Sequence, residues 1–153
     1  PIDLLSPWEA ALAGAGFDPS RPSAWLLEGF LFYLSDAHLT ALLERALQQM
    51  APTSRIGFDV INKLTLTSPL TSKWVEMQAH CGAPWIGSMD DPVGFLAAHS
   101  CQATLTSPGA PEANYDRWPY PVIPVTMPEM PHLWFVTAEK QGLATSLKKE
   151  RVE

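Results

Sequence analysis

Apolar residues in the first half of the chain form two short continuous runs on either side of one helical stripe. Residues 24–28 are a short apolar run that follows prolines, a pattern typical of a buried strand. After Ser35, which is suited to cap a helix, apolar side chains recur from Leu39 to Met50 at the spacing of one helix face. Residues 55–61 are rich in β-formers and predict a second strand. The order strand, helix, strand indicates a βαβ unit with a parallel sheet and a right-handed crossover.

Caps, prolines and β-rich composition predict further elements around this unit. The expected helices cover about 7–15, from Ser68-Pro69 through about His80, and from Asp90-Asp91-Pro92 to near His99; the expected strands cover 102–107 and 133–138. In the helix that ends near His80, Leu70, Trp74 and Met77 fall on one face. The glycines of the Ala13–Phe17 segment follow a helix, whereas a dinucleotide-binding fingerprint follows a strand, so we interpret them as a helix stop.

The length of 153 residues fits one α/β domain, and two segments of it stand apart in composition. Residues 108–131 contain seven prolines and predict a long loop. Residues 140–153 read as a solvated tail. The chain also begins without an initiator Met, at what looks like the entrance to a structural element. We therefore expect 1–153 to be a single partial domain, a piece of something longer.

Charge and cysteine content exclude several classes of partner. The net charge of −6 argues against nucleic acid and anionic membrane surfaces, and the short basic cluster 148–151 is interrupted by an acid. No run approaches the roughly 18 apolar residues that span a bilayer. Two cysteines, Cys81 and Cys101, make no disulfide framework, so we expect a cytoplasmic protein.

Spacing also disfavours two kinds of catalytic centre. His80-Cys81 and His99-Ser100-Cys101 do not follow the usual pairing of zinc ligands, so no metal is expected, and buried Cys with helix-end His is the better account. No Gly-x-Ser-x-Gly elbow exists, which argues against an α/β hydrolase.

A single carboxylate, Glu28, interrupts the apolar run Ala24–Leu34. A buried, unpaired carboxylate costs roughly several kcal/mol, so Glu28 either surfaces or has a partner. In open parallel sheets ligands bind beyond the carboxyl ends of the strands, which is where Glu28-Gly29 would lie. Glu28 could then accept hydrogen bonds from ligand hydroxyls or an amino group. The alternative is a structural pairing with an Arg or a helix N-terminus.

Two other polar segments are candidates for the same region. Asp59-Val60-Ile61-Asn62 ends the second predicted strand, although a solvated strand end explains it as well. In the proline-rich loop, Tyr115, Arg117, Trp118 and Tyr120 combine aromatic rings with one guanidinium. Loops held in this way often line substrate pockets, and the alternative is a cover that packs its aromatics on the sheet.

These residues resemble a known family. The segments "GFDPSRPSAWLLEGFLFYL" and "PTSRIGFDVIN", and more loosely "DDPVGFLAAH", "RWPYPVIP" and "HLWFVTA", are similar to the C-terminal half of the leucine carboxyl methyltransferase-like family. These proteins are class I S-adenosyl-L-methionine-dependent methyltransferases, and bacterial members are often described only as O-methyltransferases. The resemblance implies the C-terminal half of a Rossmann-like methyltransferase sheet. It would hold the parallel βαβ unit and a terminal antiparallel hairpin, made by strands 102–107 and 133–138, with helices on both faces.

The resemblance also implies site residues. Asp3 and Leu4 match the family's pair at the adenine end of S-adenosyl-L-methionine, Glu28 its glutamate at the cofactor site, and Tyr33 a neighbouring aromatic contact. Glu28 would then pair with the cofactor. The family's glycine-rich loop and its ribose-binding acid would precede Asp3 and are not in this sequence, so this chain alone is expected to be inactive.

The function implied is an O-methyltransferase fragment that acts on a small-molecule carboxylate or hydroxyl. Methyl transfer from a sulfonium is an in-line displacement that depends mainly on positioning. A carboxylate acceptor needs no general base, whereas a hydroxyl acceptor does; Arg117 could hold an acceptor carboxylate bidentately. The expected partners are the methyl acceptor and the N-terminal half of the same enzyme, or self-association through the sheet edge. The alternative is a noncatalytic remnant or interaction module that pairs with a partner chain through that open edge.

Overall fold

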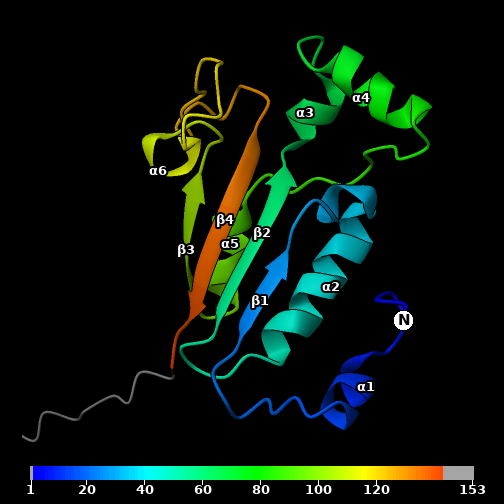
Figure 1. Ribbon diagram of the computed structural model, residues 1–153, viewed down its shortest axis with the longest axis vertical. Coiled ribbons are helices and arrows are strands. Elements are labelled where there is room, and N and C mark those ends of the chain that lie inside the picture. The colour runs from blue at the N-terminus through cyan, green and yellow to red at the C-terminus, as the bar shows by residue number, and fades with distance from the viewer. Residues whose placement is uncertain (1, 143–153) are drawn as a thin grey trace, which may run out of the picture.

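A computed structural model of the protein, which describes residues 2–142, contains one four-stranded sheet (Figure 1). The strands are β1 (Ala24–Leu27), β2 (Arg55–Ile61), β3 (Cys101–Thr106) and β4 (Leu133–Lys140). Their order across the sheet is β1-β2-β4-β3. β1 and β2 are parallel, and β4 runs antiparallel to both β2 and β3. The predicted parallel pair and terminal antiparallel hairpin are both confirmed.

Seven helical segments connect the strands. They are α1 (Glu9–Gly14), the 3-10 turn η1 (Leu31–Tyr33), α2 (Asp36–Gln48), α3 (Lys63–Thr67), α4 (Ser72–His80), α5 (Pro92–Ala98) and α6 (Pro111–Asn114). The helix α2 begins as predicted, because the Ser35 hydroxyl oxygen accepts a hydrogen bond from His38 N at 3.3 Å. Its apolar stripe, which includes Leu39 and Leu43, is buried.

The prediction that a helix starts at Ser68-Pro69 is wrong. Ser68 instead ends α3, a short helix that the pattern did not predict, and α4 begins four residues later at Ser72. The backbone of Ser68 is extended (ψ 138°), which is what steric conflict with the ring of a following proline favours. The proline thus separates two helices where we expected it to open one.

The helices that pack on the sheet share one face. Strand β2 buries Ile56, Phe58 and Val60 on that face, where they form one core with α2 and with Leu96 of α5. We expected helices on both faces, and in residues 2–142 this is not found. The reason is the direction of the chain: the crossovers from β1 to β2 and from β2 to β3 both advance toward the β3 edge. Crossovers of the same hand that advance in the same direction place their helices on the same face.

The opposite face, called the open face below, is exposed. Leu26 of β1 lies on it with 74% of its surface accessible, and Phe135 of β4 with 40%. β1 is also an edge strand, since it pairs with β2 alone. The sheet therefore has one covered face, one open face and an unpaired edge at β1.

The N-terminal segment is held to α2 by Arg45. Its guanidinium binds both carboxylate oxygens of Glu9, at 2.6 Å and 2.8 Å, and donates to the carbonyl oxygens of Leu4 and Ser6. It also lies 5.0 Å from the centre of the Trp8 ring. These charge-assisted bonds lower the pKa of Glu9 to about 2, the Arg45 hydrogen bond being the largest cause.

At the other end, β4 extends to Lys140, whose Nζ donates to His99 O at 2.8 Å. Most of the expected tail over 140–153, including the basic cluster 148–151, lies outside the described residues. Within residues 2–142, no helix has the length and apolar character needed to cross a membrane.

Candidate functional site

One row of side chains crosses the open face where β1 and β2 end. Asp59 of β2 pairs with Phe135 of β4, which pairs in turn with Thr106 of β3. Glu28 directly follows Leu27, the last paired residue of β1, just as Asp59 follows Phe58, the partner of Leu27. Glu28, Asp59, Phe135 and Thr106 are therefore neighbours at one end of the sheet, although they lie far apart in the sequence.

This row is the floor of a large cavity, called the cleft below, with a volume of about 930 Å³. One wall comes from the α3–α4 region and includes Leu70, Thr71 and Trp74. The other wall comes from residues 107–123, which contain α6. Both walls stand beyond the carboxyl ends of β1 and β2 (Figure 1), the place where open α/β sheets bind ligands.

Asp59 is the most strongly held polar group of the floor. Its Oδ1 accepts a hydrogen bond from Gly29 N at 2.7 Å, and Gly29 has φ of 63°. Burial raises the pKa of Asp59 above its ordinary value; the Gly29 bond opposes this, and the nearby Glu28 charge adds to it. The structure thus favours the interpretation of Asp59 as a residue of the cleft over the alternative of a solvated strand end, which the sequence also allowed.

Glu28 lies in the cleft without a structural partner. Within residues 2–142 it takes part in no side-chain hydrogen bond or ion pair, so the alternative of a structural pairing with an Arg is not observed there. Its side chain is exposed at the carboxyl end of β1. A carboxylate in this position is free to accept hydrogen bonds from a ligand.

A buried asparagine links α3, which belongs to one wall, to the loop that enters β4. Asn62 Oδ1 accepts hydrogen bonds from Thr65 N at 3.1 Å and from His132 N at 2.8 Å, and its Nδ2 donates to Met130 O at 2.8 Å. One side chain thus starts α3 and anchors the loop that enters β4. His132, which also lines the cleft, is stacked on Trp134 at an interplanar angle of 19°.

Three of the four aromatic or basic residues predicted from the proline-rich loop line the cleft. They are Tyr115, Arg117 and Trp118; Tyr120 does not line it and packs edge-on against Trp118, with ring centres 5.4 Å apart. Trp118 lies against Gly109, where an added Cβ would overlap the indole. The loop therefore lines the cleft and also packs on itself.

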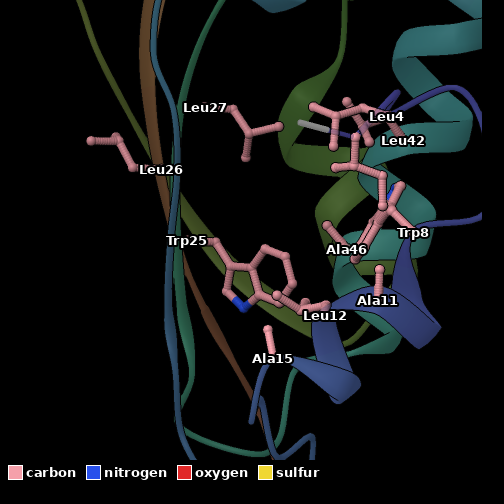
Figure 2. A pocket seen from close by; sticks show the side chains of 11 residues that line it. Leu4, Trp8, Ala11, Leu12, Ala15, Trp25, Leu26, Leu27, Leu42 and Ala46 are labelled. Atoms are coloured by element: carbon pink, nitrogen blue, oxygen red, sulfur yellow. The ribbon is translucent and has the colours of Figure 1, made fainter.

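The remaining predicted cofactor residues do not share this cleft. Leu4 lines a separate apolar pocket of about 530 Å³ between α1, β1 and α2, and Figure 2 shows Trp25 and Leu27 pointing into it while Leu26 points away. Asp3 is used in its own turn, where its Oδ1 accepts from Leu5 N at 2.9 Å. Tyr33 lies in η1 against Phe32. The structure thus brings Glu28 together with the loop residues, but not with Asp3, Leu4 and Tyr33.

The apolar pocket is the weaker candidate site. Its lining residues include Trp8, Trp25 and Leu42 and carry no charged side chain. Ligand sites usually combine an apolar wall with a few polar groups that orient the ligand. The cleft has that combination and the apolar pocket does not.

Several cleft residues were not predicted from the sequence. Thr65 lies in a segment for which no element was predicted, His132 lies between the predicted loop and the last predicted strand, and Phe135 lies in that strand. The alternation of β4 was the one available signal: its odd-numbered residues 135 and 137 face away from the core. The register that aligns Phe135 with Asp59 depends on long-range pairing, which no local pattern encodes.

Comparison with known proteins gives a family match. The model of the leucine carboxyl methyltransferase family matches residues 1–47, a range that contains Glu28. A Streptomyces avermitilis protein named "Putative S-adenosyl-L-methionine-dependent methyltransferase" is 39% identical over 106 residues, which cover 67% of this chain and 35% of that protein. A similarly named protein of Mycobacteroides abscessus is 30% identical over 134 residues, covering 77% of this chain and 43% of that one. The chain thus spans roughly a third of the length of the curated relatives, 35% of the first and 36% of one from Streptomyces coelicolor.

Solved structures show the same fold. A crystal structure described as a putative methyltransferase from Thermobifida fusca superposes with a TM-score of 0.63 at 17% identity, over 92% of this chain and 53% of that chain. A DUF574 family protein from Streptomyces avermitilis gives 0.62 at 12% identity, over 91% and 53%. At this level of sequence identity, the similarities concern the fold alone.

Proposed function

We propose that this chain belongs to the leucine carboxyl methyltransferase family, whose model matches residues 1–47, and that it forms part of an S-adenosyl-L-methionine-dependent O-methyltransferase. Its share of the enzyme would be one side of the cofactor site together with the acceptor side. The acceptor would be a small molecule that presents a carboxylate or a hydroxyl. The observation that carries the proposal is Glu28, a carboxylate at the carboxyl end of β1 that has no side-chain partner in residues 2–142 and lies inside the segment that the family model matches.

The residues of the cleft fit part of the cofactor. S-adenosyl-L-methionine supplies an electrophilic methyl group, and its hydroxyl and ammonium groups are hydrogen-bond donors. A carboxylate such as that of Glu28 can accept hydrogen bonds from them. Asp3, Leu4 and Tyr33 remain predicted contacts that lie outside the cleft in this structure. A complete site would therefore require either a rearrangement of the N-terminal segment or residues contributed by another part of the enzyme.

The cleft residues would act by positioning rather than by covalent chemistry. Phe135 and Trp74 would exclude water from the reacting groups, and the bound acceptor would be held in line with the methyl group. The loop with Tyr115, Arg117 and Trp118 would supply the acceptor wall.

Calorimetric titration with S-adenosyl-L-homocysteine tests this proposal. Glu28→Gln removes a charged acceptor, so we expect binding to weaken by about tenfold to a hundredfold. Glu76→Gln on α4 is the matched control; it removes the same charge outside the cleft and should leave binding unchanged. The titration is run on the chain alone and after addition of an N-terminal methyltransferase half. Heat in the second case only would support a split enzyme, and no heat in either case would refute the proposal.

A second function has its own supporting observation. The edge strand β1 and the exposed Leu26 offer a surface for strand pairing, so the chain could act as a noncatalytic module that binds a partner or a second copy. Intact-mass analysis of native material distinguishes the two. A co-purifying N-terminal piece supports the enzyme, whereas a homodimer that binds no S-adenosyl-L-homocysteine supports the module.

A further inference from the structure

The charges of the cleft are unevenly distributed, and this bears on the acceptor. Glu28 and Asp59 lie on the floor and Glu112 on the α6 wall, whereas Arg117 is the only lysine or arginine that lines the cleft in the part of the chain that the structure describes. Arg117 is exposed and comes from the loop after α6, not from the strand ends. Within residues 2–142, no ion pair neutralises either floor carboxylate.

An acceptor carboxylate would therefore meet two like charges at the floor. In a half-buried site, each repulsion is stronger than in water because the effective dielectric constant is lower. A neutral hydroxyl meets no such repulsion and can donate a hydrogen bond to either carboxylate.

Asp59 is the floor carboxylate that is better placed to receive a proton. Its Oδ1 is occupied by Gly29 N at 2.7 Å, while its Oδ2 has no hydrogen-bond partner within residues 2–142. Burial makes this carboxylate more basic than an ordinary Asp. Glu28, by contrast, is exposed and is the residue assigned to the cofactor above.

The walls around this group are apolar and aromatic. Leu70 and Trp74 come from one side, Trp118 from the other, and Phe135 borders Asp59 on the floor. Rings and aliphatic groups of a ligand would be buried against these side chains, with the polar group directed to the floor.

We propose that the methyl acceptor is a neutral hydroxyl carried on an aromatic or otherwise apolar body, and that Asp59 binds this hydroxyl and accepts its proton. The proposal rests on the proposed function and narrows its acceptor from carboxylate or hydroxyl to hydroxyl alone. In the step itself, the acceptor oxygen forms its bond to the methyl carbon as the carbon–sulfur bond breaks, with the electron pair remaining on sulfur. The hydroxyl proton passes to Asp59 and from there to solvent.

Matched probes test the charge preference without any methyl donor. Binding of 4-ethylphenol and 4-ethylbenzoate to the full chain is measured by ligand-observed NMR at pH 7.5, where the phenol is neutral and the benzoate is an anion. We expect the phenol to bind at least about tenfold more tightly. Asp59→Asn retains an acceptor for Gly29 N but removes the charge, so it should strengthen benzoate binding and reduce the ratio to below about threefold.

Two further variants separate this result from simpler explanations. Glu76→Gln, which removes one negative charge outside the cleft, should leave the ratio unchanged. Arg117→Ala removes the cation of the acceptor wall and so tests the opposite assignment, in which Arg117 holds a carboxylate; the phenol should still bind more tightly than the benzoate. Tighter binding of benzoate, its loss in Arg117→Ala, or failure of both probes to bind would overturn the proposal. Since no cofactor is present, none of these outcomes depends on whether Glu28 binds S-adenosyl-L-homocysteine.

Discussion

The covered and open faces of the sheet are built from alternate residues of the same strands, yet they have different roles. On the covered face Phe58, Val60 and Val136 are 3% exposed or less and belong to one core with α2 and α5. On the open face Asp59 and Phe135 sit between those same residues and line the cleft. Along β2 and β4, a residue that contributes to stability is therefore followed directly by a residue that is available to a ligand.

The comparison teaches that the cleft depends on the core for its geometry but not for its chemistry. The strands are held in register by packing on the covered face, and that register aligns Glu28, Asp59 and Phe135 across the other face. Substitutions on the two faces should consequently separate stability from ligand binding.

The largest difference is expected between two phenylalanines. Phe58→Ala removes a side chain that is 3% exposed and should lower the free energy of unfolding by about 3–5 kcal/mol. Phe135→Ala removes one that is 40% exposed and should cost about 1 kcal/mol or less. Urea denaturation measures both. Equal losses would show that the open face is buried in solution, which would contradict the comparison.

A smaller loss in the free energy of unfolding is expected for the substitution of Asn62. Asn62→Ala leaves Thr65 N and His132 N without their acceptor, so we expect a loss of about 1–3 kcal/mol. Backbone amide exchange should also accelerate in α3 and in the loop before β4. A uniform effect across the chain, with α3 no more affected than α2, would refute the role of Asn62 as the link between α3 and the loop before β4.

Asp59→Asn is expected to stabilise the fold slightly while it weakens acceptor binding. The pKa of Asp59 is raised in the folded state, so its ionisation costs stability above that pKa, and the cost disappears as the pH falls below the unfolded-state value. The variant should therefore have the higher denaturation midpoint at pH 7, and the difference should shrink toward pH 3. A lower midpoint at pH 7 would mean that the Asp59 charge has a stabilising partner.

The smallest effect on stability is expected for the Glu9–Arg45 ion pair, which lies away from both faces of the sheet. The pKa of Glu9 falls from 4.5 to about 2 on folding, so its contribution is present above pH 4.5 and is lost between pH 4.5 and 2. Over this range the midpoint of the wild-type chain should fall more than that of Glu9→Gln. Parallel curves would indicate that the pair adds nothing measurable, as is common for exposed ion pairs.

Much of the covered face was predictable, and the cleft was predictable only in part. The α2 stripe and the bounds of β2 follow from local periodicity, and Glu28 was identified because a lone carboxylate is conspicuous in an apolar run. The start of α4 was wrong because Pro69 acts on the residue before it, and the shared face of the helices follows from strand order, which residue patterns do not specify. Phe135 and His132 reach the cleft through pairings with residues some 70 positions away.

Hydrogen–deuterium exchange of the chain with and without S-adenosyl-L-homocysteine tests the central claim most directly, namely that a ligand site lies on the open face at the ends of β1 and β2. The account predicts protection of residues 28–33 and 59–65, with no change in the α2 stripe around Leu43. Protection confined to residues 2–15, around the apolar pocket, or no protection in the presence of an added N-terminal half, would contradict it.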